Sequence, residues 1–351
     1  MKDTITLARE LIRFKTTKDN PEELQRCISF VGSYLKHPNL IIKRFERNQK
    51  PSLVVTFEDT KSPEVFFCGH LDVVPALNEE QYEAKIDANF LYGRGSADMK
   101  TACAAFMNLF RKLAEQNEKP SIGLMLVTDE EIGGKDGCKY LLEEGYSCKF
   151  FISGELSDMK IGYEAKGLLL LKIKTNGKGA HSAKPWEGNS AIDLMRTSLS
   201  KIEELFEAPQ KEEYQNTMII TEINGGEALN SVPAECTATL NIRFVPEEKP
   251  EIIIENIKLI CPEIEVVLNE PSSQCSMENK YTKILSQLSG RGFIQTPEAS
   301  DARYFSNKGI PAIIFGLIGK EMHGSEEAVN IPSLLEYEKI IYDFTKNNTY
   351  L

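Results

Sequence analysis

The sequence predicts an α/β protein, with a catalytic domain on a largely parallel central sheet and a smaller inserted domain. Short apolar runs of strand length, such as residues 65–68 and 122–127, alternate with amphipathic helical stretches. Polar residues follow these runs directly, which is typical of the carboxyl ends of parallel strands. A chain of 351 residues is too long for one ordinary core, so two domains are expected.

The first elements are marked by clear boundary signals. Apolar positions within residues 4–14 predict a helix. A second helix should begin after Asn20, because an N-cap, Pro21 at the first turn and Glu23 at the capping-box position follow one another. It should end near Leu35. Strands are expected over residues 40–46, 52–57 and 65–68.

The central part of the chain continues this alternation. Residues 98–116 predict a long helix opening at Asp98, and 122–127 a buried strand. Gly133 and Gly134 are expected to open a short helix that runs to about Glu143. Another strand is predicted at 150–152. Its carboxyl end would meet those of the strands at 65–68 and 122–127 at one edge of the sheet.

The pattern changes after residue 166 and returns near 272. The order strand, helix, strand, strand, helix, strand is that of a ferredoxin-like unit, predicted over residues 168–175, 188–206, 217–224, 234–244, 250–260 and 264–269. The remaining elements are a helix at 278–289, strands at 293–296 and 311–316, and a helix from about 333. We therefore predict a catalytic domain of residues 1–166 and 272–351, and an inserted domain of residues 167–271.

Composition excludes several classes of protein. The net charge of −11, without any block of basic residues, argues against binding to nucleic acid or anionic membranes. No apolar run reaches membrane-spanning length, and the amino terminus lacks a signal-peptide core. The eight cysteines never form a Cys-x-x-Cys pair, which favours reduced thiols and a cytoplasmic location.

Histidine and carboxylate residues with catalytic or metal-binding potential stand where the predicted strands end. His70 and Asp72 follow the strand at 65–68, and side chains two residues apart in extended backbone share a face. Neutral imidazole is a good zinc ligand, and a carboxylate against its other nitrogen fixes its orientation. Further carboxylates stand at similar loop starts: Asp98, Glu130, Glu131 and Glu155. Histidines and carboxylates converging at one sheet edge indicate a metal-dependent hydrolase.

Five ordered motifs strengthen this hypothesis. They are His70-Leu71-Asp72-Val73-Val74-Pro75, Tyr92-Gly93-Arg94-Gly95-Ser96-Ala97-Asp98-Met99-Lys100, Thr128-Asp129-Glu130-Glu131-Ile132-Gly133-Gly134, Gly154-Glu155 and Met322-His323-Gly324-Ser325-Glu326-Glu327. Together they resemble the acetylornithine deacetylase / succinyl-diaminopimelate desuccinylase / carboxypeptidase G family of two-zinc amidohydrolases. The segment 297–304 differs from the glycine-rich signature of the desuccinylases, so the acyl group stays open.

The resemblance implies a role for each residue. Asp98 is expected to bridge two Zn²⁺ ions, for which Co²⁺ or Mn²⁺ could substitute. His70 and Glu155 are expected to complete one site, and Glu131 and His323 the other. Asp72 is expected to orient His70, and Glu130 to act as the general acid/base. The resemblance also implies a lid and dimerisation role for the inserted domain, which would supply His181, often to the partner subunit, and Arg243 for the substrate carboxylate. Asn230 and Lys166 are further candidates for lining the substrate site.

The expected reaction is release of an acyl group from a small N-acyl amino acid by a water molecule that the metals activate. A dipeptidase or carboxypeptidase of the same family is the alternative, because both cleave an amide next to a carboxylate. A catalytically silent metal- or metabolite-binding protein would be a different class. Retention of Glu130 and of every expected ligand argues against it.

Overall fold

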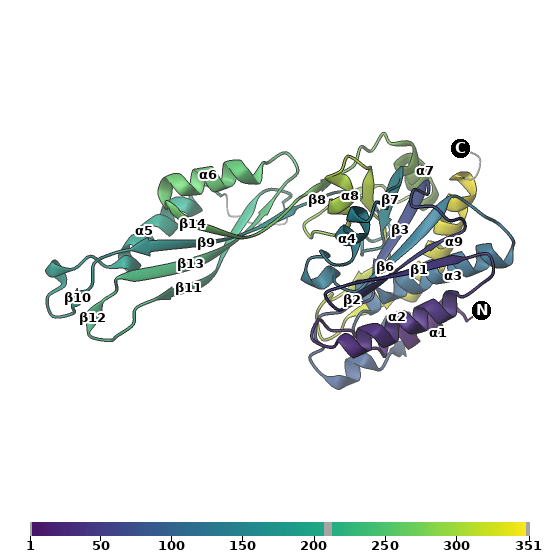
Figure 1. Cartoon of the computed structure of the whole chain (residues 1–351), viewed down its shortest axis with the longest axis horizontal. Coiled ribbons are helices and arrows are strands. Elements are labelled where there is room, and N and C mark those ends of the chain that lie inside the picture. The colour runs from purple at the N-terminus through teal and green to yellow at the C-terminus, as the bar shows by residue number, and fades with distance from the viewer. Residues whose placement is uncertain (1, 207–212, 349–351) are drawn as a thin grey trace. The chain divides into compact units, whose positions relative to one another are not determined.

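The computed structural model describes residues 2–206 and 213–348, which form two compact units. The first unit comprises the chain up to residue 164 together with 273–296 and the chain from 300 onward. The second comprises residues 165–272 and 297–299. Each unit has its own hydrophobic core. Figure 1 shows the helices and strands of both units.

The first unit is built on a nine-stranded mixed sheet. Neighbouring strands in the central part, β6–β3, β3–β7 and β7–β17, are parallel. The flanking pairs β1–β2, β2–β6 and β17–β8 are antiparallel. In spatial order the strands are β1 (Ile41–Arg47), β2 (Lys50–Thr56), β6 (Ile122–Val127), β3 (Val65–His70), β7 (Phe150–Ser153), β17 (Ala312–Ile314), β8 (Ile161–Ala165) and β15 (Ser273–Gln274), with β16 (Phe293–Thr296) paired to β8. The predicted α/β fold is confirmed, and its parallel part is the centre of the sheet.

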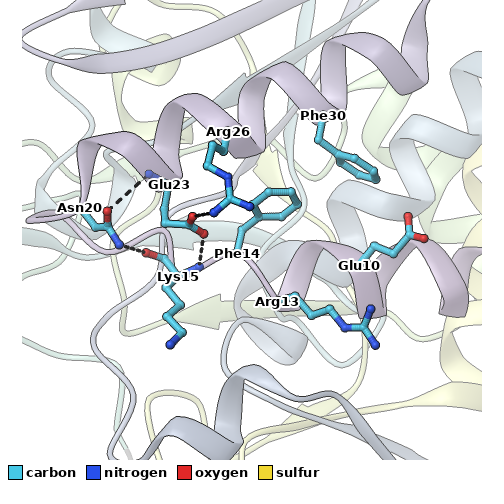
Figure 2. Close-up of a pocket in the computed structure, with 8 residues that line it drawn as sticks. All are labelled: Glu10, Arg13, Phe14, Lys15, Asn20, Glu23, Arg26 and Phe30. Atoms are coloured by element: carbon cyan, nitrogen blue, oxygen red, sulfur yellow. Dashed lines mark hydrogen bonds and ion pairs between the residues drawn. The ribbon is translucent and has the colours of Figure 1, made fainter.

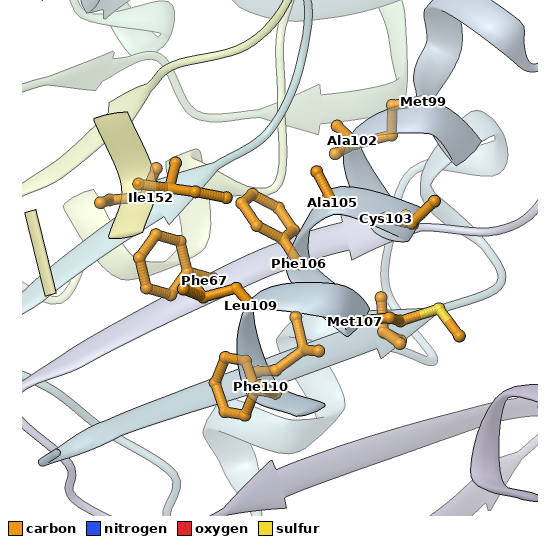
Figure 3. Close-up of a cluster of buried hydrophobic side chains, with 14 of the residues drawn as sticks. Phe67, Met99, Ala102, Cys103, Ala105, Phe106, Met107, Leu109, Phe110 and Ile152 are labelled. Atoms are coloured by element: carbon orange, nitrogen blue, oxygen red, sulfur yellow. The ribbon is translucent and has the colours of Figure 1, made fainter. Parts of the chain in front are cut away.

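Helices cover both faces of this sheet, and strand alternation decides which side chains they meet. Phe67 and Ile152 point toward the larger helical layer, where the Phe106 ring lies 5.1 Å from that of Phe67 (Figure 3). Phe66 and Phe151 point toward the smaller layer. The larger layer contains α1 (Thr4–Ile12), α2 (Pro21–Leu35), α3 (Thr101–Glu115), α7 (Lys280–Ser289) and α9 (Ile331–Asn348); the smaller contains α4 (Cys138–Glu143) and α8 (Ala302–Ser306). Across residues 2–206 and 213–348, no helix combines the length and apolarity needed to span a bilayer.

The predicted helix start is correct at Asn20, where an N-cap is present, and wrong at Asp98 and at Gly133. Asn20 caps α2 as predicted, and its side chain accepts a hydrogen bond from the Glu23 amide. The prediction that a helix opens at Asp98 is wrong. Asp98 has extended, non-helical backbone (φ −124°, ψ 93°) and a cis peptide bond to Met99, and α3 begins at Thr101.

The short helix expected from Gly133 also begins later, at Cys138. Gly133 and Gly134 have φ of 106° and 65°, and this left-handed backbone cannot continue a right-handed helix. The two glycines instead form the turn that follows Glu130 and Glu131.

A small four-stranded sheet in the first unit was not predicted. Its order is β18 (Gly319–Lys320), β19 (Ala328–Asn330), β5 (Phe90–Tyr92) and β4 (Lys85–Asp87). The antiparallel pairing of β5 with β19 joins segments that are far apart in the sequence. It brings the loop that contains Asp98 close to the loop that contains His323.

The second unit has the predicted βαββαβ order, and its sheet order β11–β13–β9–β14 is that of a ferredoxin-like fold. Leu171, Leu240 and Ile242 point from the sheet toward the helices and form the core with Leu199 and Ile257. The elements are β9 (Gly167–Asn176), α5 (Ala191–Glu203), β11 (Thr217–Gly225), β13 (Glu235–Phe244), α6 (Pro250–Ile260) and β14 (Glu263–Glu270). A two-stranded pair of β10 (Ala180–His181) and β12 (Ser231–Val232) extends from it.

Candidate metal centre

Side chains that follow three parallel strands of the first unit meet at one edge of its sheet. His70 ends β3, Glu130 and Glu131 follow β6, and Glu155 follows β7. Because these strands are parallel, their carboxyl ends lie side by side. The small sheet adds Asp98 and His323, so the site residues predicted in this unit converge on one place.

Asp98 lies between the two histidines. Its Oδ1 is 2.8 Å from Nε2 of His70, and its Oδ2 is 3.0 Å from Nε2 of His323. His70 Nε2 also lies 3.6 Å from Glu155 Oε1, and His323 Nε2 lies 3.2 Å from Glu131 Oε2. One carboxylate therefore links two imidazole–carboxylate pairs, one on each side.

Asp72 connects the strand ends beneath the site. Its carboxylate accepts hydrogen bonds from the backbone amides of Glu130 (3.3 Å) and Glu131 (3.0 Å). Nδ1 of His70 lies 3.0 Å from the Asp72 carbonyl oxygen and 3.5 Å from its Oδ1. Asp72 thus fixes both the imidazole and the turn that carries the two glutamates.

The concentration of negative charge shifts the protonation of the whole site. Burial disfavours a charge on His70, but Glu155 and Asp98 outweigh it and raise the pKa of His70 well above its usual value. Hydrogen bonds to Asp98 and Glu131 raise the pKa of His323 to about 10. Burial raises the pKa of Glu155 to about 8 and also raises that of Glu130. The metal-free site therefore binds protons at neutral pH.

The donor set fits divalent metal ions. Two groups of ligand atoms lie within 4.8 Å of one another, formed by His70, Glu130 and Glu155 and by His70, Asp98 and Glu131. Glu155 Oε1 is fully buried without a hydrogen-bond partner, as expected of an oxygen that can bind a cation. Imidazole nitrogens and carboxylate oxygens are ordinary ligands of zinc.

A buried ion pair that supports this site was not predicted from the sequence. Arg94 and Glu327 are each 1% exposed and form a salt bridge. Glu327 Oε1 accepts hydrogen bonds from the Ala97 and Asp98 amides (3.1 and 3.2 Å), and Arg94 donates to the His323 carbonyl oxygen (3.0 Å). His323 has a left-handed φ of 65°, which is unfavourable for a side chain of this size, so this contact supports a strained backbone.

Arg303 is a second residue whose role was not predicted. Its guanidinium is buried, lies 3.4 Å from Glu130 Oε1 and donates a 2.9 Å hydrogen bond to the Gly133 carbonyl oxygen. It therefore holds both the side chain of Glu130 and the turn after it. The local sequence Ser300-Asp301-Ala302-Arg303 contains no pattern that would predict this contact.

The remaining predicted residues belong to the second unit and separate into two groups. His181 and Asn230 line one hollow of about 490 Å³, together with Glu235 at the start of β13. Arg243 lies near the other end of β13, where the burial of Lys166 and then the charge of Arg243 lower the pKa of Lys166. Arg243 lies eight residue steps along β13 from Glu235, which is about 26 Å at about 3.3 Å per residue.

A different hollow of the first unit, about 570 Å³, is lined by none of the predicted site residues (Figure 2). It lies between α1 and α2, and its side chains hold the connection between these helices. Glu23 forms a salt bridge with Arg26 and accepts from the Lys15 amide (3.2 Å), while Asn20 donates to the Lys15 carbonyl (3.3 Å). These contacts explain the hollow as a helix junction.

Comparison with known proteins agrees with the geometry. Residues 66–347 match Peptidase family M20/M25/M40. Succinyl-diaminopimelate desuccinylase from Pelagibacter ubique is 30% identical over 98% of each chain. Among solved structures, a tripeptidase from Staphylococcus aureus (20% identity, 99% and 98% of the two chains) and a metallo-carboxypeptidase from Sulfolobus solfataricus (17%, 100% of each) both superpose with a TM-score of 0.81.

The fold and the match identify the class: a hydrolase that acts on amide bonds in a metal-dependent family. The chain belongs to Peptidase family M20/M25/M40.

The buried ion pair gives a first prediction. Glu327→Gln leaves the Arg94 charge buried and uncompensated, so the free energy of unfolding should fall by about 3–5 kcal/mol. Urea denaturation measures this loss. The exposed neighbour Glu326→Gln is the control and should unfold like the unaltered protein. A cost below about 1 kcal/mol for Glu327→Gln would contradict the role given to the pair.

Protonation of the metal-free site gives a second prediction. Ligands must lose their protons to bind a metal, and His70, His323 and Glu155 have raised pKa values. Zinc binding at pH 7 should release about two or more protons per chain, measured with an indicator dye in weak buffer. Since protons compete with the metal, affinity should fall as the pH is lowered from 8 to 6. Binding without proton release, or with affinity independent of pH, would show that the histidines are neutral.

Proposed function

We propose that this protein is a two-metal amidohydrolase that releases an acyl group from a small N-acyl amino acid. The observation that carries the proposal is the position of Asp98, whose two oxygens face two different histidines. A shared carboxylate of this kind suits two ions held side by side. The relatives named as desuccinylase and peptidases support hydrolysis of an amide as the reaction.

The ligand assignment follows the contacts within the site. Asp98 would be shared, His70 and Glu155 would complete one Zn²⁺ site, and Glu131 and His323 the other. Co²⁺ or Mn²⁺ could substitute, because both accept the same nitrogen and oxygen ligands. A solved Bacillus subtilis relative (14% identity, 99% and 98% of the two chains, TM-score 0.72) is described as a dinuclear metal binding peptidase, which supports a pair of ions.

When bound, the ions would polarise the amide carbonyl and lower the pKa of a water molecule. Glu130 would accept a proton from that water and transfer it to the departing amine. Arg303 holds Glu130 Oε1 in a fixed orientation, and Asp72 holds the amide of the same residue. Asp72 would also keep His70 in the orientation that presents Nε2 to a metal.

The positive charges of the second unit support a substrate that carries a carboxylate. The charge of Arg243 reaches Lys166 and helps burial to lower its pKa. Two neighbouring cations in a chain of net charge −11 form a local basic spot that would favour an anion. We assign Arg243, with Lys166 beside it, to the carboxylate of the amino acid.

We further infer that the protein is a homodimer in which His181 and Asn230 serve the partner's site. The distance of about 26 Å along β13 argues against both ends of this unit reaching one small substrate. In the described sheet, β11 is an edge strand, and its Ile219 and Ile223 are 64% and 55% exposed. An edge with exposed apolar side chains favours pairing with a second copy.

Dipeptidase or carboxypeptidase activity is the alternative. The solved relatives named as a tripeptidase and a carboxypeptidase favour it, although they show only that the fold is shared. Both kinds of substrate carry a carboxylate near the scissile amide, so the same ligand set would serve either reaction. As a location we propose the cytoplasm, because all eight cysteines are free thiols.

A substrate panel tests the proposed reaction. Zinc-loaded protein should cleave N-acetyl- or N-succinyl-amino acids with higher kcat/KM than dipeptides, measured by release of the free amine. The Glu130→Ala variant should bind the same amount of zinc with kcat reduced about 10²–10⁴-fold, since Glu130 transfers protons. Faster cleavage of dipeptides would favour the alternative. Loss of zinc in Glu130→Ala would indicate that Glu130 is the metal ligand and Glu131 the general base.

The position of His181 gives a prediction about assembly. We propose that His181 donates a hydrogen bond to the oxyanion that forms when water attacks the amide. His181→Ala should therefore lower kcat by about 10²–10³-fold, the effect of removing one oxyanion donor. Inactive His181→Ala subunits mixed with inactive Glu130→Ala subunits should regain activity, because one site of each mixed dimer has both residues. Absence of recovery after demonstrated subunit exchange would assign His181 to its own chain or outside catalysis.

A further inference from the structure

A third group of potential ligands lies on the face of β3 that meets the smaller helical layer. It consists of Cys68 on β3, Cys138 at the start of α4 and Asp301 immediately before α8. One ligand atom from each lies within 4.8 Å of the other two. All three residues are at most 2% exposed, and none belongs to the two groups that contain His70.

Asp301 provides independent evidence that this group of side chains can bind a cation. Its Oδ1 is buried and has no hydrogen-bond partner in the structure. The backbone leaves room for this oxygen, because a Cβ atom at Gly134 would lie only 2.1 Å from it. A buried carboxylate oxygen without a donor is costly, so its burial here favours binding of a cation.

The chemistry of the three ligands suits a borderline-soft divalent ion. Zinc binds thiolate sulfur at about 2.3 Å and carboxylate oxygen at about 2.0–2.2 Å. Ligand atoms around a tetrahedral ion at these distances are about 3.3–3.8 Å apart, which fits the observed limit of 4.8 Å. Asp129, whose Oδ1 is also buried without a hydrogen-bond partner, lies outside this group and acts on Asp301 only through its charge.

The charges around the group also fit a bound dication. Two thiolates and one carboxylate carry three negative charges, and a dication would leave one. The buried Arg303 guanidinium interacts electrostatically with both Cys138 and Asp301 and would offset the remainder. The same arginine contacts Glu130, so an ion in this group would be linked to the turn that carries the candidate base.

We propose that Cys68, Cys138 and Asp301 form a third, structural zinc site, distinct from the candidate catalytic pair. It ties β3 to the start of α4 and to the turn before α8. By fixing α4 and α8 on either side of the turn at Gly133 and Gly134, it holds Arg303 in place against Glu130.

Cobalt substitution distinguishes this site from the others, because only thiolate ligands give an intense sulfur-to-cobalt charge-transfer absorption in the near ultraviolet. The candidate catalytic ligands are histidines and carboxylates alone. The full chain loaded with Co²⁺ should therefore show this absorption and bind about three ions instead of two. Asp98→Asn, which disrupts the catalytic pair, should keep the absorption, so the result does not depend on the proposed function.

Cys138→Ala and Asp301→Asn should each lose one bound ion and most of the charge-transfer absorption. Cys27→Ala is the matched control, because Cys27 is an equally buried thiol on α2 outside the group, and it should retain both. Circular dichroism confirms folding of each variant, and Asp301→Asn preserves the shape of the side chain. Cobalt-loaded protein without the absorption, or with an absorption that survives in Cys138→Ala and Asp301→Asn, overturns the proposal.

Discussion

The structure of the site depends on one constraint, the burial of several carboxylates around Asp98. Asp98, Glu130, Glu131 and Glu155 gather at the edge of the sheet, and water is largely excluded from them. Such a group is stable only when positive charge is supplied. His70 and His323 supply it as protonated imidazoles in the absence of metal, and divalent ions would supply it in their presence.

The two histidines and Asp98 lie on segments that are held by different sheets, and buried contacts keep these segments together. His70 is fixed by the central sheet, whereas Asp98 and His323 depend on the small sheet in which β5 pairs with β19. The Arg94–Glu327 pair lies at this junction and bonds to both loops. A buried ion pair contributes little net stability, but its directional bonds specify geometry. Here it allows an extended Asp98 and a left-handed His323.

The sequence was sufficient for the parts of the site that local patterns encode. Apolar runs followed by His70, Glu130 and Glu155 predicted that these residues share a sheet edge, because parallel strands end together. The start of α3 was placed wrongly, since the helical pattern of residues 101–115 does not reveal the extended backbone of Asp98. The contacts of Arg94 and Arg303 were missed because their partners are distant in sequence. The periodicity of a sequence does not indicate contacts between distant segments.

The two histidines differ in their access to solvent, and this asymmetry has a kinetic consequence. The side chain of His70 is 1% exposed, whereas that of His323 is 46% exposed. If ions bind as proposed, the one held by His323 would exchange through its open side without disturbing the core. The ion held by His70 would leave only when the surrounding loops open. The site with His323 would gain or lose its ion as the free metal concentration changes. The site with His70 would keep its ion for much longer.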